Sequence, residues 1–133
     1  MKKIGLLVLL MVLTLLGAEV DWSSSYEQGL AKAKKANKPL LVLITSEQCN
    51  WCRKLESTTL RDEKIAGRIN NKFEAVNVTK DKSIYPKELV AKMVPMSYFV
   101  DPKTGKHFFS FPGYWNVEDY DSVLDDAEQK YKK

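Results

Sequence analysis

The chain has 133 residues, of which 44% are hydrophobic and 29% are charged, and its formal net charge at pH 7 is +4. This length predicts one domain with its own hydrophobic core. Two of the positive charges lie in the N-terminal segment described next, so the rest of the chain carries about +2. That excess is too small to indicate binding to nucleic acid or to a membrane surface.

The N-terminal segment has the pattern of a secretion signal. Two lysines are followed by an apolar stretch from Ile4 to Leu16 and then by the small pair Gly17-Ala18. This stretch is too short to span a bilayer comfortably. We therefore expect residues 1–18 to be a signal peptide whose cleavage leaves domain 19–133 in the periplasm or secreted. An uncleaved N-terminal anchor is the alternative.

The following elements are predicted from periodicity and from turn residues. Residues 23–38 predict an amphipathic helix that is capped by one of the three serines at 23–25 and ended by Asn37-Lys38-Pro39. The apolar run 40–44 predicts a strand covered on both faces. The patterns then predict, in chain order, a helix over 53–70 broken near Thr58-Thr59, a half-buried strand over 73–78, a short helix over 86–93, a hairpin of strands 97–100 and 107–111, and a final helix over 117–131.

The order of these elements predicts the fold class. Strands that alternate with helices indicate parallel neighbours, and the late hairpin adds an antiparallel edge. We therefore predict an α/β fold with a central mixed β-sheet, a C-terminal antiparallel hairpin and flanking helices. No separate dimerisation region follows, so we expect a monomer.

The only two cysteines of the chain, Cys49 and Cys52, lie between the predicted strand 40–44 and the helix after it. Free N–H groups and the dipole at a helix start stabilise a thiolate, so we expect a lowered pKa for Cys49. Cys49 is then the attacking sulfur, and Cys52 is the resolving sulfur. Arg53 is expected to add positive potential on the same side, whereas Glu47 would oppose it or shuttle a proton.

Three other interpretations of the cysteine pair compete with redox chemistry. A c-type haem site needs histidine directly after the second cysteine, where Arg53 stands. A zinc site needs four ligands, but the chain offers one cysteine pair and one histidine, His107, so we expect no metal. A purely structural disulfide stays open as an alternative, although its very short loop would constrain the unfolded chain little.

With these motifs on this order of elements, the chain resembles the thioredoxin fold superfamily, and in particular secreted bacterial thioredoxin-like proteins whose redox motif ends in Trp-Cys. The resemblance covers nearly all of residues 20–131. It is carried by Lys38-Pro39 before an apolar strand, Cys49-Asn50-Trp51-Cys52, Val94-Pro95, the turn Asp101-Pro102-Lys103-Thr104-Gly105-Lys106, and Gly113-Tyr114 before the last helix.

The resemblance implies roles for several residues. It implies that Pro95 is a cis proline facing the disulfide and that the backbone of Val94 pairs with an extended substrate segment. Trp51 is expected to be partly exposed and to contact partners, and Asn50 with it influences the reduction potential. Tyr114 is a candidate for the active-site face, because the loop before the last helix lies near that face in relatives.

The chain departs from thioredoxins proper at two positions outside the cysteine motif. A buried acid stands six residues before the first cysteine in those proteins, whereas Leu43 stands here. The usual internal proton acceptor for the resolving thiol is therefore missing, which weighs against fast general reductase activity. Met93 stands where glycine precedes Val94-Pro95 in relatives, and this change is expected to alter the substrate groove.

The sequence thus predicts an exported thiol–disulfide oxidoreductase, specifically a periplasmic disulfide reductase that uses Cys49 and Cys52. Its substrates would be protein thiols and disulfides, and a membrane thiol-transfer protein would supply its electrons. No cofactor is expected, because the cysteine pair itself carries two electrons, and no nucleic acid is expected as a partner. The alternative is a non-catalytic thioredoxin-fold binding module with a structural disulfide.

Overall fold

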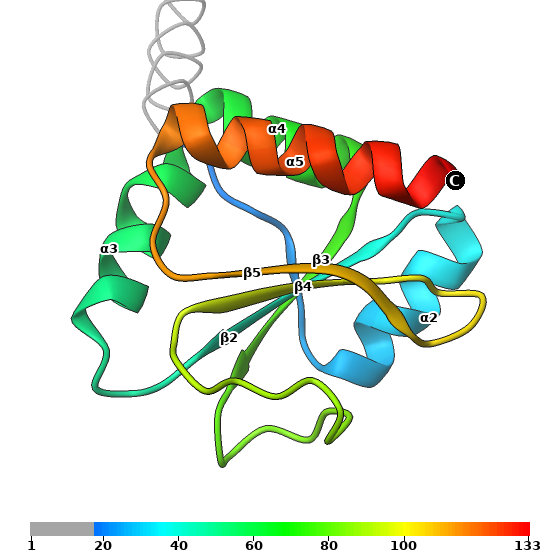
Figure 1. The fold of residues 1–133 in the computed structure, drawn as a ribbon, viewed down its shortest axis with the longest axis horizontal. Coiled ribbons are helices and arrows are strands. Elements are labelled where there is room, and N and C mark those ends of the chain that lie inside the picture. Colours follow the sequence, from blue (N-terminus) through cyan, green and yellow to red (C-terminus); the bar gives the residue numbers. More distant parts are fainter. Residues whose placement is uncertain (1–17) are drawn as a thin grey trace, which may run out of the picture.

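A mixed five-stranded sheet forms the centre of residues 18–133, the part of the chain that the computed structural model describes (Figure 1). The predicted signal peptide therefore lies outside the described residues except for its last residue. Along the sheet the strand order is β1-β3-β2-β4-β5. The strands are β1 (Trp22–Ser23), β2 (Leu40–Thr45), β3 (Glu74–Thr79), β4 (Met96–Val100) and β5 (His107–Pro112).

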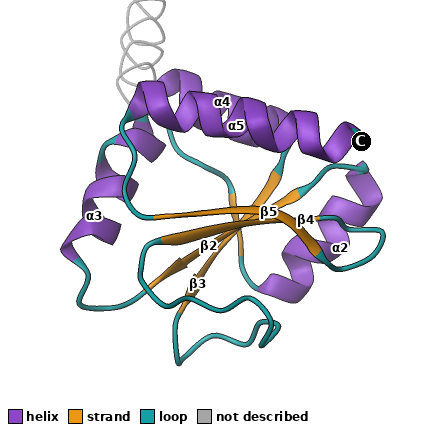
Figure 2. Cartoon of the chain, viewed as in Figure 1, coloured by secondary structure: helices purple, strands orange, loops and turns teal. Residues whose placement is uncertain are grey.

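The pairing of these strands confirms the predicted mixed sheet with a late antiparallel hairpin. β3 pairs in parallel with both β1 and β2, whereas β4 is antiparallel to both β2 and β5. All six residues of β2, the predicted doubly covered strand, are buried. The fold is thus the expected α/β arrangement, with helices on both sides of the strands (Figure 2).

The helices begin at side chains that cap them. Ser25, Asp62 and Asn116 each accept a hydrogen bond from a backbone N–H in the first turn of the helix that follows. No helix within residues 18–133 is long and apolar enough to cross a membrane. The helical segments are α2 (Tyr26–Ala36), α3 (Asn50–Ser57), the 3₁₀ helix η1 (Thr59–Arg61), α4 (Glu63–Lys72) and α5 (Val117–Lys132).

The predicted break near Thr58-Thr59 is confirmed, because η1 separates α3 from α4 there. The first helix starts at Tyr26 rather than at residue 23, since Trp22–Ser23 forms β1, an edge strand that the sequence analysis did not predict. Asn70 holds this N-terminal segment: its side chain accepts from the N–H of Asp21 at 2.8 Å and donates to the carbonyl of Glu19 at 2.9 Å.

The sheet separates two hydrophobic cores. On one face, α3, η1, α4 and α5 pack against alternate residues of the strands, with Phe99 and Tyr120 fully buried among them. On the other face, α2 and the segment between β3 and β4 cover the remaining strand residues, among them Val42 and Tyr98. The helix carrying the cysteines is therefore fixed to a rigid base by its buried Leu55.

The prediction of a short helix over 86–93 is wrong, because that segment consists of turns, bends and irregular backbone. Leu89 and Ala91 are both buried in the second core while Val90 between them is 53% exposed. That alternation cannot form one face of a helix, in which residues two apart point in different directions. The carbonyl of Val90 accepts a hydrogen bond from the hydroxyl of Tyr98 instead of from a helical N–H.

Candidate functional site

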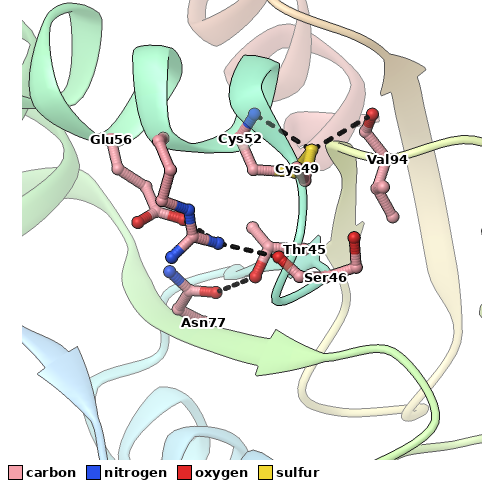
Figure 3. Close-up of a disulfide and its surroundings, with 8 residues drawn as sticks. Thr45, Ser46, Cys49, Cys52, Glu56, Asn77 and Val94 are labelled. Carbon is pink, nitrogen blue, oxygen red and sulfur yellow. Dashed lines mark hydrogen bonds and ion pairs between the residues drawn. A yellow bond between two sulfur atoms is a disulfide. The ribbon is translucent and has the colours of Figure 1, made fainter.

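Cys49 and Cys52 lie at the beginning of α3, directly after the loop that leaves β2 (Figure 3). Cys49 is the N-cap residue, and its Sγ accepts a hydrogen bond from the backbone N–H of Cys52 at 3.1 Å. The two sulfurs form a disulfide, with 5.2 Å between the Cα atoms. Cys49 is partly exposed, whereas Cys52 is completely buried. Cys49 is thus the outer residue of the pair, and Cys52 is the inner one.

The Val94-Pro95 segment approaches the disulfide from the opposite side. The peptide bond between these two residues is cis, and the carbonyl oxygen of Val94 lies 3.8 Å from the Sγ of Cys49 (Figure 3). The carbonyl of Pro95 accepts a hydrogen bond from the N–H of Gly113 at 2.7 Å. By contrast, the N–H and the carbonyl of Val94 have no main-chain partner within residues 18–133.

An apolar groove of about 280 Å³ runs beside the cysteine pair. Trp51 and Met93, its most exposed lining residues, are 56% and 51% exposed. Met93 occupies the position where the resemblance led us to expect glycine, and its methyl group would lie 3.7 Å from a Cβ at Gly113. The groove is lined by Trp51, Met93, Val94, Pro95, Gly113 and Tyr114, so it joins the cysteine motif to the cis-proline segment and the loop before α5.

Trp51 and Tyr114 form an aromatic part of the lining of this groove, and the ammonium of Lys54 lies over both rings. The rings of Trp51 and Tyr114 lie 5.6 Å apart, and the Lys54 ammonium lies 5.0 Å from the first ring centre and 4.9 Å from the second. The pKa of Tyr114 is lowered, mainly by the hydroxyls of Thr58 and Thr59 and also by the charge of Lys54. The sequence analysis missed Lys54. Its spacing of three residues from Trp51, which places both side chains on one side of a helix, was the available signal.

The charged residues predicted to modulate Cys49 are each bound to a partner. Glu47 forms an ion pair with Lys82. Arg53 donates to the carbonyl of Ser46 at 2.9 Å and lies 3.4 Å from the carboxylate of Glu56. Asn50, the first residue of α3, is exposed. In the described part of the chain, no three histidine, cysteine or acidic side chains gather in a way that could hold a metal ion.

The protein interior beneath the site is apolar apart from a few hydroxyl groups. Leu43 is fully buried and pairs across the sheet with Ser97 of β4. The hydroxyls of Ser97 and Tyr120 are buried without a hydrogen-bond partner among residues 18–133. Burial strongly raises the pKa of Tyr120, so this phenol stays protonated at neutral pH. No ionised side chain therefore occupies the place of the buried acid of thioredoxins proper.

The comparisons with known proteins agree with this geometry. Residues 26–128 match the family model of the thioredoxin-like domain. Anterior gradient protein 3 of Mus musculus is 36% identical over 89 residues, which are 65% of this chain and 52% of that protein, so the chain spans about half the length of the curated relatives it matches.

Two solved structures show the same fold. A DsbH oxidoreductase has a TM-score of 0.66 and 22% identity, covering 84% of this chain and 85% of its own. A thioredoxin from Thermus thermophilus has a TM-score of 0.67 and 22% identity, covering 84% of this chain and 86% of its own. With its cysteine pair closed at the start of α3 and a cis proline beside it, the chain belongs to the thioredoxin-like domain family.

Proposed function

We propose that this protein is an exported thiol–disulfide oxidoreductase that reduces disulfides in other proteins. The carrying observation is the asymmetric pair at the start of α3: Cys49 is accessible and its Sγ accepts the N–H of Cys52, whereas Cys52 is fully buried. The same N–H and the positive end of the helix favour a thiolate at Cys49 in the reduced protein. Export rests on the signal-like pattern of residues 1–18 and places the domain in the periplasm or outside the cell.

The reaction proceeds in two exchanges. The thiolate of Cys49 attacks one sulfur of a client disulfide, a mixed disulfide forms, and the other client sulfur leaves as a thiolate that takes up a proton. Cys52 then loses its proton and attacks the Sγ of Cys49, which releases the second client thiol. The client gains two electrons and two protons, and the protein is left as the Cys49–Cys52 disulfide. A dithiol donor, which we propose is a membrane thiol-transfer protein, returns the pair to the reduced state by the reverse exchanges.

The client would bind along Val94 and the apolar groove. The unpaired main-chain groups of Val94 suit an extended strand, and its carbonyl lies 3.8 Å from the sulfur that would be attacking. The proton leaving Cys52 finds no carboxylate at the place of the buried acid of thioredoxins proper, because Leu43 occupies that position. Water or the client thiolate would accept this proton.

Trapping with cysteine variants tests the proposal. Cys52→Ser should accumulate mixed disulfides with client proteins in the native compartment, because the second exchange is blocked, while Cys49→Ser should accumulate none. The alternative, a binding module with a structural disulfide, predicts that both variants keep their partner and that neither is trapped covalently. Absence of trapped species from Cys52→Ser would refute the proposed function.

The equilibrium reduction potential of domain 19–133 tests the direction of electron flow. A value of about −270 mV would support a reductase, and a value of about −120 mV would instead indicate an oxidant. A disulfide that resists reduction well below about −300 mV would support the structural alternative. N-terminal sequencing of the exported protein tests the cleavage after Ala18.

A further inference from the structure

The ammonium of Lys54 has an unusual environment for a surface lysine beside an apolar groove. It lies over the faces of Trp51 and Tyr114, at 5.0 and 4.9 Å from the ring centres. No carboxylate of residues 18–133 lies within ion-pair distance of it. Ring faces attract a cation but do not neutralise its charge. Lys54 does not itself line the groove, but its positive charge lies over two of the lining rings and has no carboxylate partner in this part of the chain.

None of the residues that line the groove is acidic. The neighbouring Glu47 is paired with Lys82, and Glu56 is paired with Arg53. Two other acids, Asp62 and Glu118, line a neighbouring cavity that shares Tyr114 with the groove, and neither lines the groove itself. On the far side of the groove, exposed Lys92 directly precedes the lining residue Met93.

From this arrangement we propose that the site selects client segments that carry an acidic residue close to the reacting cysteine. Lys54 would recognise that residue by an ion pair with its carboxylate. The inference rests on the proposed function, because it names the substrate class of the same site. A polypeptide is the occupant that fits, since the unpaired main chain of Val94 suits an extended backbone and the apolar lining suits a neighbouring hydrophobic side chain. The client carboxylate would lie against the Lys54 ammonium, beside the rings of Trp51 and Tyr114.

Rates with matched peptides test the inference. Three extended peptides of one sequence carry a single cysteine flanked by glutamate, glutamine or lysine, each activated as a disulfide with 2-nitro-5-thiobenzoate. The thiolate of Cys49 in the reduced protein attacks the peptide sulfur, and the coloured thiobenzoate leaves as a thiolate, so its absorbance reports the first exchange. Each rate is divided by the rate of the same peptide with dithiothreitol, which removes differences in intrinsic reactivity.

We expect the glutamate peptide to react about two- to fivefold faster than the glutamine peptide at low salt, the range that one solvent-exposed ion pair supplies. The lysine peptide should be the slowest. The preference should fall towards one in about 0.5 M salt, because the charges are solvent-exposed. Lys54→Met should abolish the preference and Lys54→Arg should retain it. Lys32→Met, which removes an exposed lysine from α2 across the sheet, should leave it unchanged.

The possible failures are distinct. Equal normalised rates for the three peptides would overturn the inference while leaving the proposed function intact. If the preference for the glutamate peptide survives Lys54→Met, or if Lys32→Met reduces it as much as Lys54→Met does, the preference comes from the overall charge of the protein. Either result would overturn the role of Lys54. No reaction of Cys49 with any peptide, where dithiothreitol reacts with all three, would refute the proposed function and with it the inference.

Discussion

Arg68 joins α4 to α5, and its removal should be among the most costly changes on the surface of the domain. Its guanidinium donates to the carboxylate of Asp121 at 2.8 Å and to the backbone carbonyl of the same residue at 2.9 Å. It also forms ion pairs with Asp125 and, at 3.3 Å, with Glu128. The side chain of Arg68 is only 18% exposed, whereas that of Asp125 is 58% exposed.

These exposures set the expected magnitude for Arg68→Met, which keeps most of the aliphatic stem. The part-buried, charge-assisted bonds to Asp121 should contribute about 1.5–3 kcal/mol. The pair with the exposed Asp125 and the longer pair with Glu128 should add at most about 1 kcal/mol together. We therefore expect the free energy of unfolding to fall by about 1.5–4 kcal/mol, and by less for Arg68→Lys, which keeps the charge but not the fork of donors.

Urea unfolding at pH 7 measures this loss, and the slope of the transition should not change. Arg61→Met is the matched control. Arg61 is 49% exposed and its only ion pair in the described residues, with Glu19, is 3.5 Å long, so its loss should cost less than about 0.5 kcal/mol. If Arg68→Met proves no more destabilising than Arg61→Met, the reasoning from burial and bond number is refuted.

Three further changes have expected outcomes. Hydrogen bonds from Lys64 and then from Arg68 hold the pKa of Asp121 below its ordinary value of 3.8, so this carboxylate stabilises the fold above that pH. In urea unfolding at several pH values, the difference in unfolding free energy between Asp121→Asn and the natural protein should therefore shrink as the pH falls below 3.8. Tyr98→Phe removes the donor to the carbonyl of Val90 and should cost about 0.5–1.5 kcal/mol, with faster trypsin cleavage between β3 and β4 and unchanged cleavage elsewhere. Gly29→Val should lower the melting temperature, because even a Cβ at that position would lie 3.1 Å from the side chain of Leu40 in β2. An unchanged melting temperature would show that α2 can shift to make room for the larger side chain.

Much of the fold could be predicted because its signals are local. The continuous apolar run 40–44 indicated a strand covered on both faces, and β2 is buried along its whole length. The polar pair Thr58-Thr59 indicated a break in a long helical pattern, and η1 occupies that place. Such features depend on residues a few positions apart in sequence, which a periodicity can register.

The segment 86–93 was mispredicted because tertiary contacts decide its conformation. Pro86 suits a first helical turn, yet the burial of Leu89 and Ala91 against the sheet imposes an alternating pattern. β1 was missed since two residues carry no detectable period, and their strand exists only through pairing with β3.

The cysteine pair of the candidate site was predictable, whereas the contact between Lys54 and Tyr114 was not. Two cysteines separated by two residues fall within one helical turn, so their proximity could be predicted from the sequence alone, as Cys49 and Cys52 show. The position of Lys54 depends on Tyr114, which is sixty residues further along the chain and reaches the groove only when the loop before α5 folds back. No local pattern contains that contact.

The unequal burial of the two sulfurs also fixes the valency of the site. Cys52 has no exposed surface, so any outside molecule that bonds covalently to the pair must do so through Cys49. The domain can consequently hold one partner at a time and cannot crosslink two. If Cys52 resolves mixed disulfides as proposed, the sulfur that ends each one is shielded from competing thiols, and the protein itself would set how long the mixed disulfide lasts.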